Sequence, residues 1–301
     1  RNQEDVEDVD SVDCITYTGA TDKLTIVDGC KIIIDLGTYS TKVGLYTDDA
    51  PRRNLPTLSN DIVSCDDAVQ TADAEFFLMQ FHKDSFEETE KVKKGMTNVL
   101  KDIYRLVLRG CLPSRYPVYF TLNQYLCEAV DMVRGCFTEL GVEVVEYVPP
   151  YEQLMKRMQF TNNTALILDF GSTISLLEVV RGEVADHMEI DNILTTVMED
   201  ILTAKGVKCK RWDVMHALHT AFCSENMNQR TVTLSSGVKV SLDDEDLKGL
   251  HNALFSDESL LALFIAIIKA APLTSRRTLM NHIIVVGGFA LEAVEEKLLG
   301  V

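Results

Sequence analysis

Two segments of this chain share one pattern, and their repetition limits the folds that the chain can adopt. The first reads KIIIDLGTYSTKVGLY from Lys31 to Tyr46, and the second reads ALILDFGSTISLLEVV from Ala165 to Val180. In each, an apolar run typical of a buried strand ends in Asp-x-Gly and a hydroxyl residue, and a second run follows closely enough to pair back antiparallel. The repetition predicts two related β-hairpins, one in each half of the chain, that face a shared cleft.

A third glycine turn comes near the end of the chain, where a buried strand at 283–286 runs into Gly287, Gly288 and Phe289. Glycine has no Cβ, so the backbone there can approach a flat ligand closely. Hairpin turns that aim N–H groups outward can bind phosphate oxygens, and Lys42 would add a point charge. The alternative is that glycine only supplies a positive φ in ordinary α/β turns. The order of the three turns favours a nucleotide site.

Composition bounds the class of protein. With 301 residues, 46% of them apolar, the chain can bury a large core as one bilobed unit or two domains. The net charge of −17 argues against nucleic-acid binding and favours basic partner surfaces. Eight cysteines without a CxxC pair indicate reduced thiols in a cytosolic or nuclear protein. The longest apolar run, 260–268, is too short to span a bilayer, so no membrane insertion is expected.

The chain divides into three predicted parts: an acidic extension at 1–28, a first half at 29–161 with a reduced outer subdomain at about 57–95, and a second half at 162–301. Apolar spacing predicts helices at 96–108, 126–140, 193–202, 213–223 and 259–271, strands at 116–122 and 142–148, and a hairpin at 231–242. The strand, helix and strand between 116 and 148 predict a parallel crossover.

The order of two phosphate hairpins and a Gly-Gly turn resembles the actin and sugar-kinase superfamily. Lys42-x-Gly44 followed by DDAPR at 48–52 and Pro56 looks like eukaryotic actin, and PLTSRR at 272–277 is similar to actin-related proteins, above all the divergent kind in the pointed-end complex of dynactin. The resemblance implies an α/β, bilobed, ribonuclease H-like fold with two related halves around a nucleotide cleft. Because actins continue beyond the Gly-Gly turn, it also implies a shortened C-terminal part of the first lobe.

The resemblance implies a site for ATP or ADP with Mg²⁺. The residues that would contact the nucleotide are Gly37, Thr38, Tyr39, Lys42, Gly171, Ser172, Thr173, His216, His219, Gly287, Gly288 and Phe289. Asp35 and Asp169 would hold Mg²⁺ through water, since this metal keeps much of its hydration. The alternative for both aspartates is capping of their own turns.

Several departures from actin weaken this site. Tyr39 stands where actin has a second glycine, and Ser172 and Thr173 replace an aspartate and a glycine. The nearest match to the glutamine that orients the attacking water is Tyr151, with Gln153 two residues on. Phosphoryl transfer depends on positioning and electrostatics, so we expect nucleotide binding with impaired or absent hydrolysis and assign no catalytic residue.

These features predict a non-catalytic actin-related structural subunit, cytoplasmic and cytoskeletal. It would cap or dock on the end of an actin-like filament in a dynactin-type complex, with actin-like subunits and pointed-end complex proteins as partners. The first alternative is an ATP-hydrolysing actin-related protein of a nuclear chromatin-remodelling complex. The second is a small-molecule kinase, for which the sequence offers no convincing catalytic aspartate.

Three clusters have two interpretations each. The apolar residues between Phe76 and Phe81 are either local core or a partner surface. The lysines 91, 93 and 94 form either a solvated patch or a partner contact. Four potential zinc ligands (Cys209, His216, His219, Cys223) fit no standard finger spacing, and the alternative is a plain buried helix face.

Overall fold

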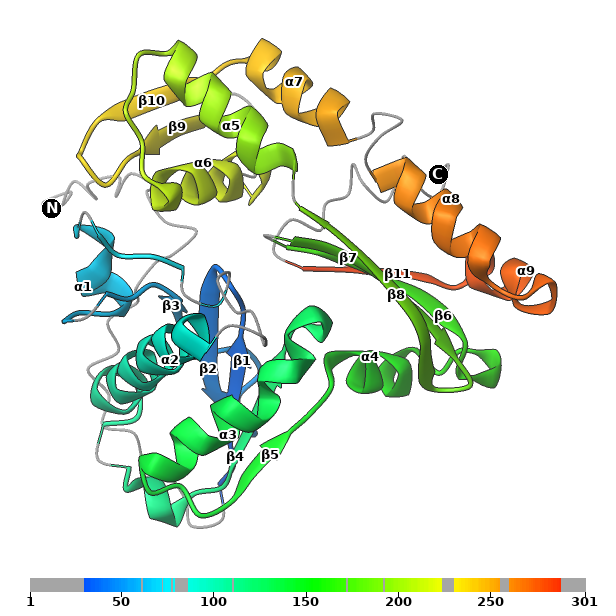
Figure 1. The fold of residues 1–301 in the computed structure, drawn as a ribbon, viewed down its shortest axis with the longest axis horizontal. Helices are drawn as coiled ribbons and strands as arrows, with labels where there is room; N and C mark the ends of the chain where they lie inside the picture. The colour runs from blue at the N-terminus through cyan, green and yellow to red at the C-terminus, as the bar shows by residue number, and fades with distance from the viewer. Residues whose placement is uncertain are drawn as a thin grey trace, which may run out of the picture.

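The computed structural model describes residues 30–60, 62–71, 73–76, 78, 86–109, 111–171, 173–191, 193–223, 230–254 and 260–287. Helices and strands are mixed along this part of the chain, so the protein is of the α/β class, as predicted. Figure 1 shows two large sheets, one built from β1 to β5 and the other from β6, β7, β8 and β11. The predicted extension at 1–28 lies outside the described residues.

The first sheet has the strand order β3-β2-β1-β4-β5. Its strands are β1 (Ile32–Leu36), β2 (Ser40–Leu45), β3 (Arg53–Pro56), β4 (Val118–Leu122) and β5 (Val145–Tyr147). The pairs β1–β2 and β2–β3 are antiparallel, whereas β1–β4 and β4–β5 are parallel. The predicted hairpin and the predicted parallel crossover are therefore confirmed, with β5 shorter than expected.

Three helices accompany this sheet: α1 (Cys65–Val69), α2 (Phe86–Leu106) and α3 (Val130–Glu139). Side chains of α2 and α3 share one core with β1 and β4. A 3₁₀ segment, Gln124–Ala129, takes the start of the predicted helix at 126–140, because a helix often opens with a tighter turn. Gly141, at φ +89°, follows the end of α3 as predicted, since glycine adopts this backbone conformation without strain.

The second sheet has the order β11-β6-β7-β8. Its strands are β6 (Ala165–Phe170), β7 (Thr173–Val180), β8 (Glu183–Asp191) and β11 (Ile283–Val286). The pairs β6–β7 and β7–β8 are antiparallel, and β6–β11 is parallel. The strands β8-β7-β6-β11 thus repeat the order and directions of β3-β2-β1-β4. This duplication is the structural counterpart of the repeated sequence pattern.

Outside the two sheets, the chain after β5 is mainly helical. Its helices are α4 (Pro150–Met158), α5 (Ile193–Ala204), α6 (Arg211–Cys223), α7 (Asp244–Leu254), α8 (Leu260–Ala270) and α9 (Leu273–Asn281), and its hairpin is β9 (Arg230–Thr233) with β10 (Lys239–Leu242). In Figure 1, α8 and α4 lie on opposite sides of the second sheet, while α5, α6, α7 and the hairpin form a separate group beside α1. The helices and the hairpin predicted from spacing are all present.

Strand β6 is buried on both faces, because side chains alternate along a strand. Leu166 and Leu168 join a core that includes α8, whereas Ala165 and Ile167 join a smaller core with Met155 of α4. The continuous apolar run before Asp169 reflects this two-sided burial.

The core that includes α8 also reaches into the first half of the chain. Tyr39, Leu58, Ala68 and Phe76 pack in it together with residues of α5 and α6. Burial of Phe76 and Leu78 confirms the local-core interpretation for these two residues. Phe77, Met79 and Phe81 lie outside the described residues.

Candidate functional site

The two predicted turns occupy the same place in their sheets. Asp35 is the penultimate residue of β1 and lies opposite Lys42 of β2. Asp169 is the penultimate residue of β6 and lies opposite Ser175 of β7. The repeated Asp-x-Gly pattern therefore brings two carboxylates to corresponding strand ends, with a lysine beside one and a serine beside the other.

The two turns lie close together. Lys42 Nζ donates a hydrogen bond to Asp35 Oδ2 at 2.9 Å, and Asn123 Nδ2 donates one to Asp169 Oδ2 at 2.7 Å. Burial, and then the negative charge of Asp35, raise the pKa of Asp169 to about 6, while Lys42 and the hydrogen bond from Asn123 lower it. The first-sheet and second-sheet aspartates thus belong to one electrostatic cluster, and Asp169 is mostly ionised at pH 7.

Asn123 is a site residue that the sequence reasoning missed. It follows β4 directly, and β4 is the parallel neighbour of β1, so its amide reaches the strand end where the carboxylates meet. Its Oδ1 is buried and accepts no hydrogen bond within the described part of the chain. The sequence signal that could have identified Asn123 is an asparagine placed directly after the strand predicted at 116–122.

The residue assigned from the sequence to the water-orienting position lies elsewhere. Tyr151 belongs to α4 and packs against the small core on the far face of the second sheet, and Gln153 is exposed. The side-chain amide beside the aspartates is that of Asn123. Tyr151 therefore does not stand beside Asp35 and Asp169.

The glycines of the two turns differ in how tightly they are enclosed. The N–H of Gly37 donates to the carbonyl of Ser40 at 3.2 Å, and a Cβ on Gly37 would lie 2.7 Å from that same oxygen. The N–H of Gly171 donates to the carbonyl of Thr173 at 3.3 Å, but a Cβ on Gly171 would have ordinary contacts. Both N–H groups therefore close their own turns, and only Gly37 is sterically required.

The ring of Tyr39 points away from the first sheet and into helix α6. It stacks on Trp212 with centroids 5.3 Å apart and lies 5.9 Å from His219 and 5.7 Å from Phe76. Trp212 stacks in turn on His216 at 5.8 Å and 7°. We call these five residues, Tyr39, Phe76, Trp212, His216 and His219, the aromatic cluster. It joins the first turn to α6 and explains the burial of Tyr39.

His219 serves in the cluster as an aromatic ring rather than as a cation. Burial, the neighbouring His216 and the positive charge of Lys42 lower the pKa of His219 to about 4. His219 is therefore neutral at pH 7 and does not supply charge to a phosphate. This agrees with the buried-helix interpretation of the face shared by His216 and His219.

At the third turn, the backbone of Phe170 takes up the space beside Gly287. Gly287 has φ +107°, and a Cβ there would collide with the backbone of Phe170 at the end of β6. The missing side chain of Gly287 thus allows β11 and β6 to approach each other. Ser172, Gly288 and Phe289 lie outside the described residues, and Thr173 begins β7.

Several residues predicted to contact a nucleotide with Mg²⁺ are engaged with other side chains in this arrangement. Tyr39 and His219, both predicted to contact the nucleotide, are already in ring contact with each other. Asp35 is paired with Lys42, which the resemblance assigns to phosphate. No group of three or more metal-binding side chains occurs among the described residues, and the side chain of Cys223 is not among them.

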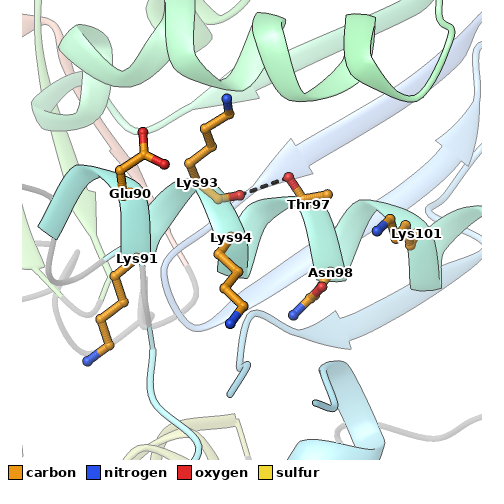
Figure 2. Close-up of a pocket in the computed structure, with 7 residues that line it drawn as sticks. All are labelled: Glu90, Lys91, Lys93, Lys94, Thr97, Asn98 and Lys101. Atoms are coloured by element: carbon orange, nitrogen blue, oxygen red, sulfur yellow. Dashed lines mark hydrogen bonds between the residues drawn. The ribbon is translucent and has the colours of Figure 1, made fainter. Parts of the chain in front are cut away.

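A second candidate surface lies along α2, where four lysines line a hollow of about 580 Å³ (Figure 2). Lys93 points toward α3 and pairs with Glu139 at 2.7 Å, while Lys91 points the other way and pairs with Glu75 at 2.5 Å. Because the cations diverge and two are neutralised by glutamates, the hollow does not converge on one ligand. The solvated-patch interpretation describes it better.

No protein-family model matches the chain, and no curated protein matches it. A search of the described helices finds none that is both long and apolar enough to cross a membrane.

Proposed function

We propose that this chain is a non-catalytic, actin-related structural subunit. It docks on the end of an actin-like filament in a dynactin-type complex and mediates contacts with other actin-like subunits and pointed-end complex proteins. The proposal includes a bilobed actin-like fold and a cytoplasmic, cytoskeletal location. Duplicated sheets whose equivalent strand ends bring Asp35 and Asp169 together support the actin-like part.

The observation that carries the non-catalytic part is the contact of the Tyr39 ring with Trp212 and His219. Phosphoryl transfer needs a nucleotide held in a fixed geometry between both halves. A side chain that fills the space between the expected walls removes that geometry. The net charge of −17 further suits a subunit that meets basic partner surfaces.

One observation favours a second candidate, the ATP-hydrolysing actin-related protein of a nuclear remodelling complex. The buried Oδ1 of Asn123 lies on the amide that bonds Asp169, where an acceptor can orient a water molecule. In that case hydrolysis depends on Asn123 and not on Tyr151.

Two measurements on the full chain separate the candidates. Purified protein incubated with Mg·ATP should release phosphate no faster than the Asn123→Ala variant, whereas a hydrolase would lose its activity in that variant. Tagged protein isolated from cells should bring down actin-like filament subunits and pointed-end proteins. Recovery of chromatin-remodelling subunits in their place would overturn the proposal.

A further inference from the structure

Three contacts bridge the regions around the two sheets, at different distances from the strand ends. Asn123 bonds Asp169 at 2.7 Å beside the two turns. The aromatic cluster links Tyr39 to α6. Farther out, Lys210 Nζ donates to the carbonyls of Gln70 and Thr71 at 3.5 and 3.4 Å. The chain itself thus joins the two regions at three places.

We propose that the Tyr39 ring takes the place of a bound nucleotide, so that the aromatic cluster holds the two halves of the chain closed without a ligand. This inference rests on the proposed function, because it takes the two turns and α6 as the walls of an actin-like cleft. It adds that the closed arrangement of this subunit is independent of ATP and ADP.

Burial and geometry support this role. Tyr39 is 9% exposed and Trp212 is 7% exposed, and the angle of 20° between their planes makes the contact a stack. Stacked and tilted aromatic rings at such distances attract each other beyond the effect of burial alone. A purine inserted here would have to displace the Tyr39 ring from Trp212, and would lose this contact before gaining its own.

The local charges point the same way. Lys42, the cation of the first turn, already bonds Asp35. The Asp169 carboxylate adds negative charge, and the neutral His219, with its pKa of about 4, adds no positive charge to offset it. A polyphosphate placed between the turns without Mg²⁺ would meet two carboxylates and one engaged lysine.

Trp212 is the only tryptophan of the chain, so its fluorescence reports directly on the cluster. We expect millimolar Mg·ADP or Mg·ATP to leave the Trp212 emission and the Tm of the full-length protein unchanged. A ligand at one hundred times its Kd would raise the Tm by roughly 5 °C or more. Such a rise in the unmodified protein, with a shift in Trp212 emission, would overturn the inference and needs no variant.

Matched variants test the role of the ring. Tyr39→Ala should lower the Tm by about 5–10 °C and should expose Trp212 to acrylamide quenching, because a buried aromatic ring is removed from the contact. Tyr46→Ala removes the same side chain at a position that is 71% exposed and should change neither quantity. Tyr39→Phe keeps the ring and should behave like the unmodified protein. Equal behaviour of Tyr39→Ala and Tyr46→Ala would contradict the inference.

The failures of the two proposals are distinguishable. A nucleotide-dependent Tm in the purified chain overturns the role of Tyr39 but leaves co-purification with filament subunits as it is. Co-purification with remodelling subunits would overturn the proposed dynactin-type assembly, but would not affect the Trp212 fluorescence test of the role of Tyr39.

Discussion

The turn after β1 and the turn after β6 hold the same Asp-x-Gly pattern at equivalent places, but their surroundings differ. Asp35 pairs across the sheet with Lys42, and both side chains are more than two-fifths exposed, at 43% and 44%. Asp169 faces Ser175 at the corresponding position, is half-buried in surroundings whose desolvation raises its pKa, and bonds the amide of Asn123. One pattern therefore produces a solvated ion pair in the first sheet and a desolvated carboxylate in the second.

This difference teaches that the local pattern specifies a hairpin and not a charge state. The strand pairing needs only apolar alternation and a permissive glycine. The charge state depends on what approaches the carboxylate from another element, and only Asp169 is covered.

Gly287→Ala, at the contact between the third turn and the end of β6, should lower the stability of the protein more than the other substitutions. The new Cβ would overlap the backbone of Phe170, and alanine disfavours φ +107°, so we expect a loss of roughly 3–5 kcal/mol in the free energy of unfolding. Urea denaturation measures it. Gly237→Ala is the control, because its φ is +81° but no atom lies within 4 Å of the new Cβ, and it should cost only about 1 kcal/mol.

Asp169→Asn should change the pH dependence of stability. The folded-state pKa of Asp169 is raised from 3.8 to about 6, so the folded chain binds the proton more tightly than the unfolded chain. Its contribution to stability therefore falls by about 3 kcal/mol in total as pH rises from well below 3.8 to well above 6, and the variant lacks this fall.

The difference between wild type and Asp169→Asn at each pH is the quantity to measure. His219, whose pKa is lowered to about 4, contributes stability that is lost as pH falls from 6.5, and taking the difference cancels this opposing effect. Asp48→Asn is the control of opposite sign, because Arg52 lowers the pKa of Asp48 and its contribution is lost toward acid. A difference for Asp169→Asn that does not vary with pH would contradict the buried-carboxylate interpretation.

Gly37→Ala and Gly171→Ala should separate the two turns by their packing. The Cβ on Gly37 would press on the Ser40 carbonyl, so we expect a loss of about 1–3 kcal/mol. The Cβ on Gly171 would lie 3.6 Å from the Thr173 carbonyl, and the expected change is below about 0.5 kcal/mol. Thermal unfolding of the pair measures the contrast, and equal losses would mean that the two turns are enclosed alike.

Lys42→Met should change the free energy of unfolding by less than about 1 kcal/mol, because an exposed ion pair contributes little. It should nevertheless raise the pKa of Asp169 further, since Lys42 lowers that pKa. A carbon-detected NMR titration of the Asp169 carboxyl measures the shift. Lys156→Met removes an exposed lysine paired with Glu152 at 3.8 Å and should leave the titration of Asp169 unchanged.

The sequence predicted most of the fold because its signals are local. Alternating and continuous apolar runs located β1, β2, β6 and β7, and helical spacing located α2, α5, α6 and α8. It did not predict β3, β8, α1 or α9. It also missed the start of α2 at Phe86 and the 3₁₀ opening of α3, and made β5 too long, since the ends of elements depend on caps and neighbours.

The candidate site was predictable only in part. The chain by itself determined that Asp35 and Asp169 stand at equivalent strand ends, because the pattern that places each of them is contained in one hairpin. The tertiary structure decided that Asn123, 46 residues from Asp169 along the chain, bonds its carboxylate, and that the Tyr39 ring meets Trp212. Both contacts depend on how two separately folded sheets and α6 approach each other, and side-chain periodicity within a single element carries no information about that approach.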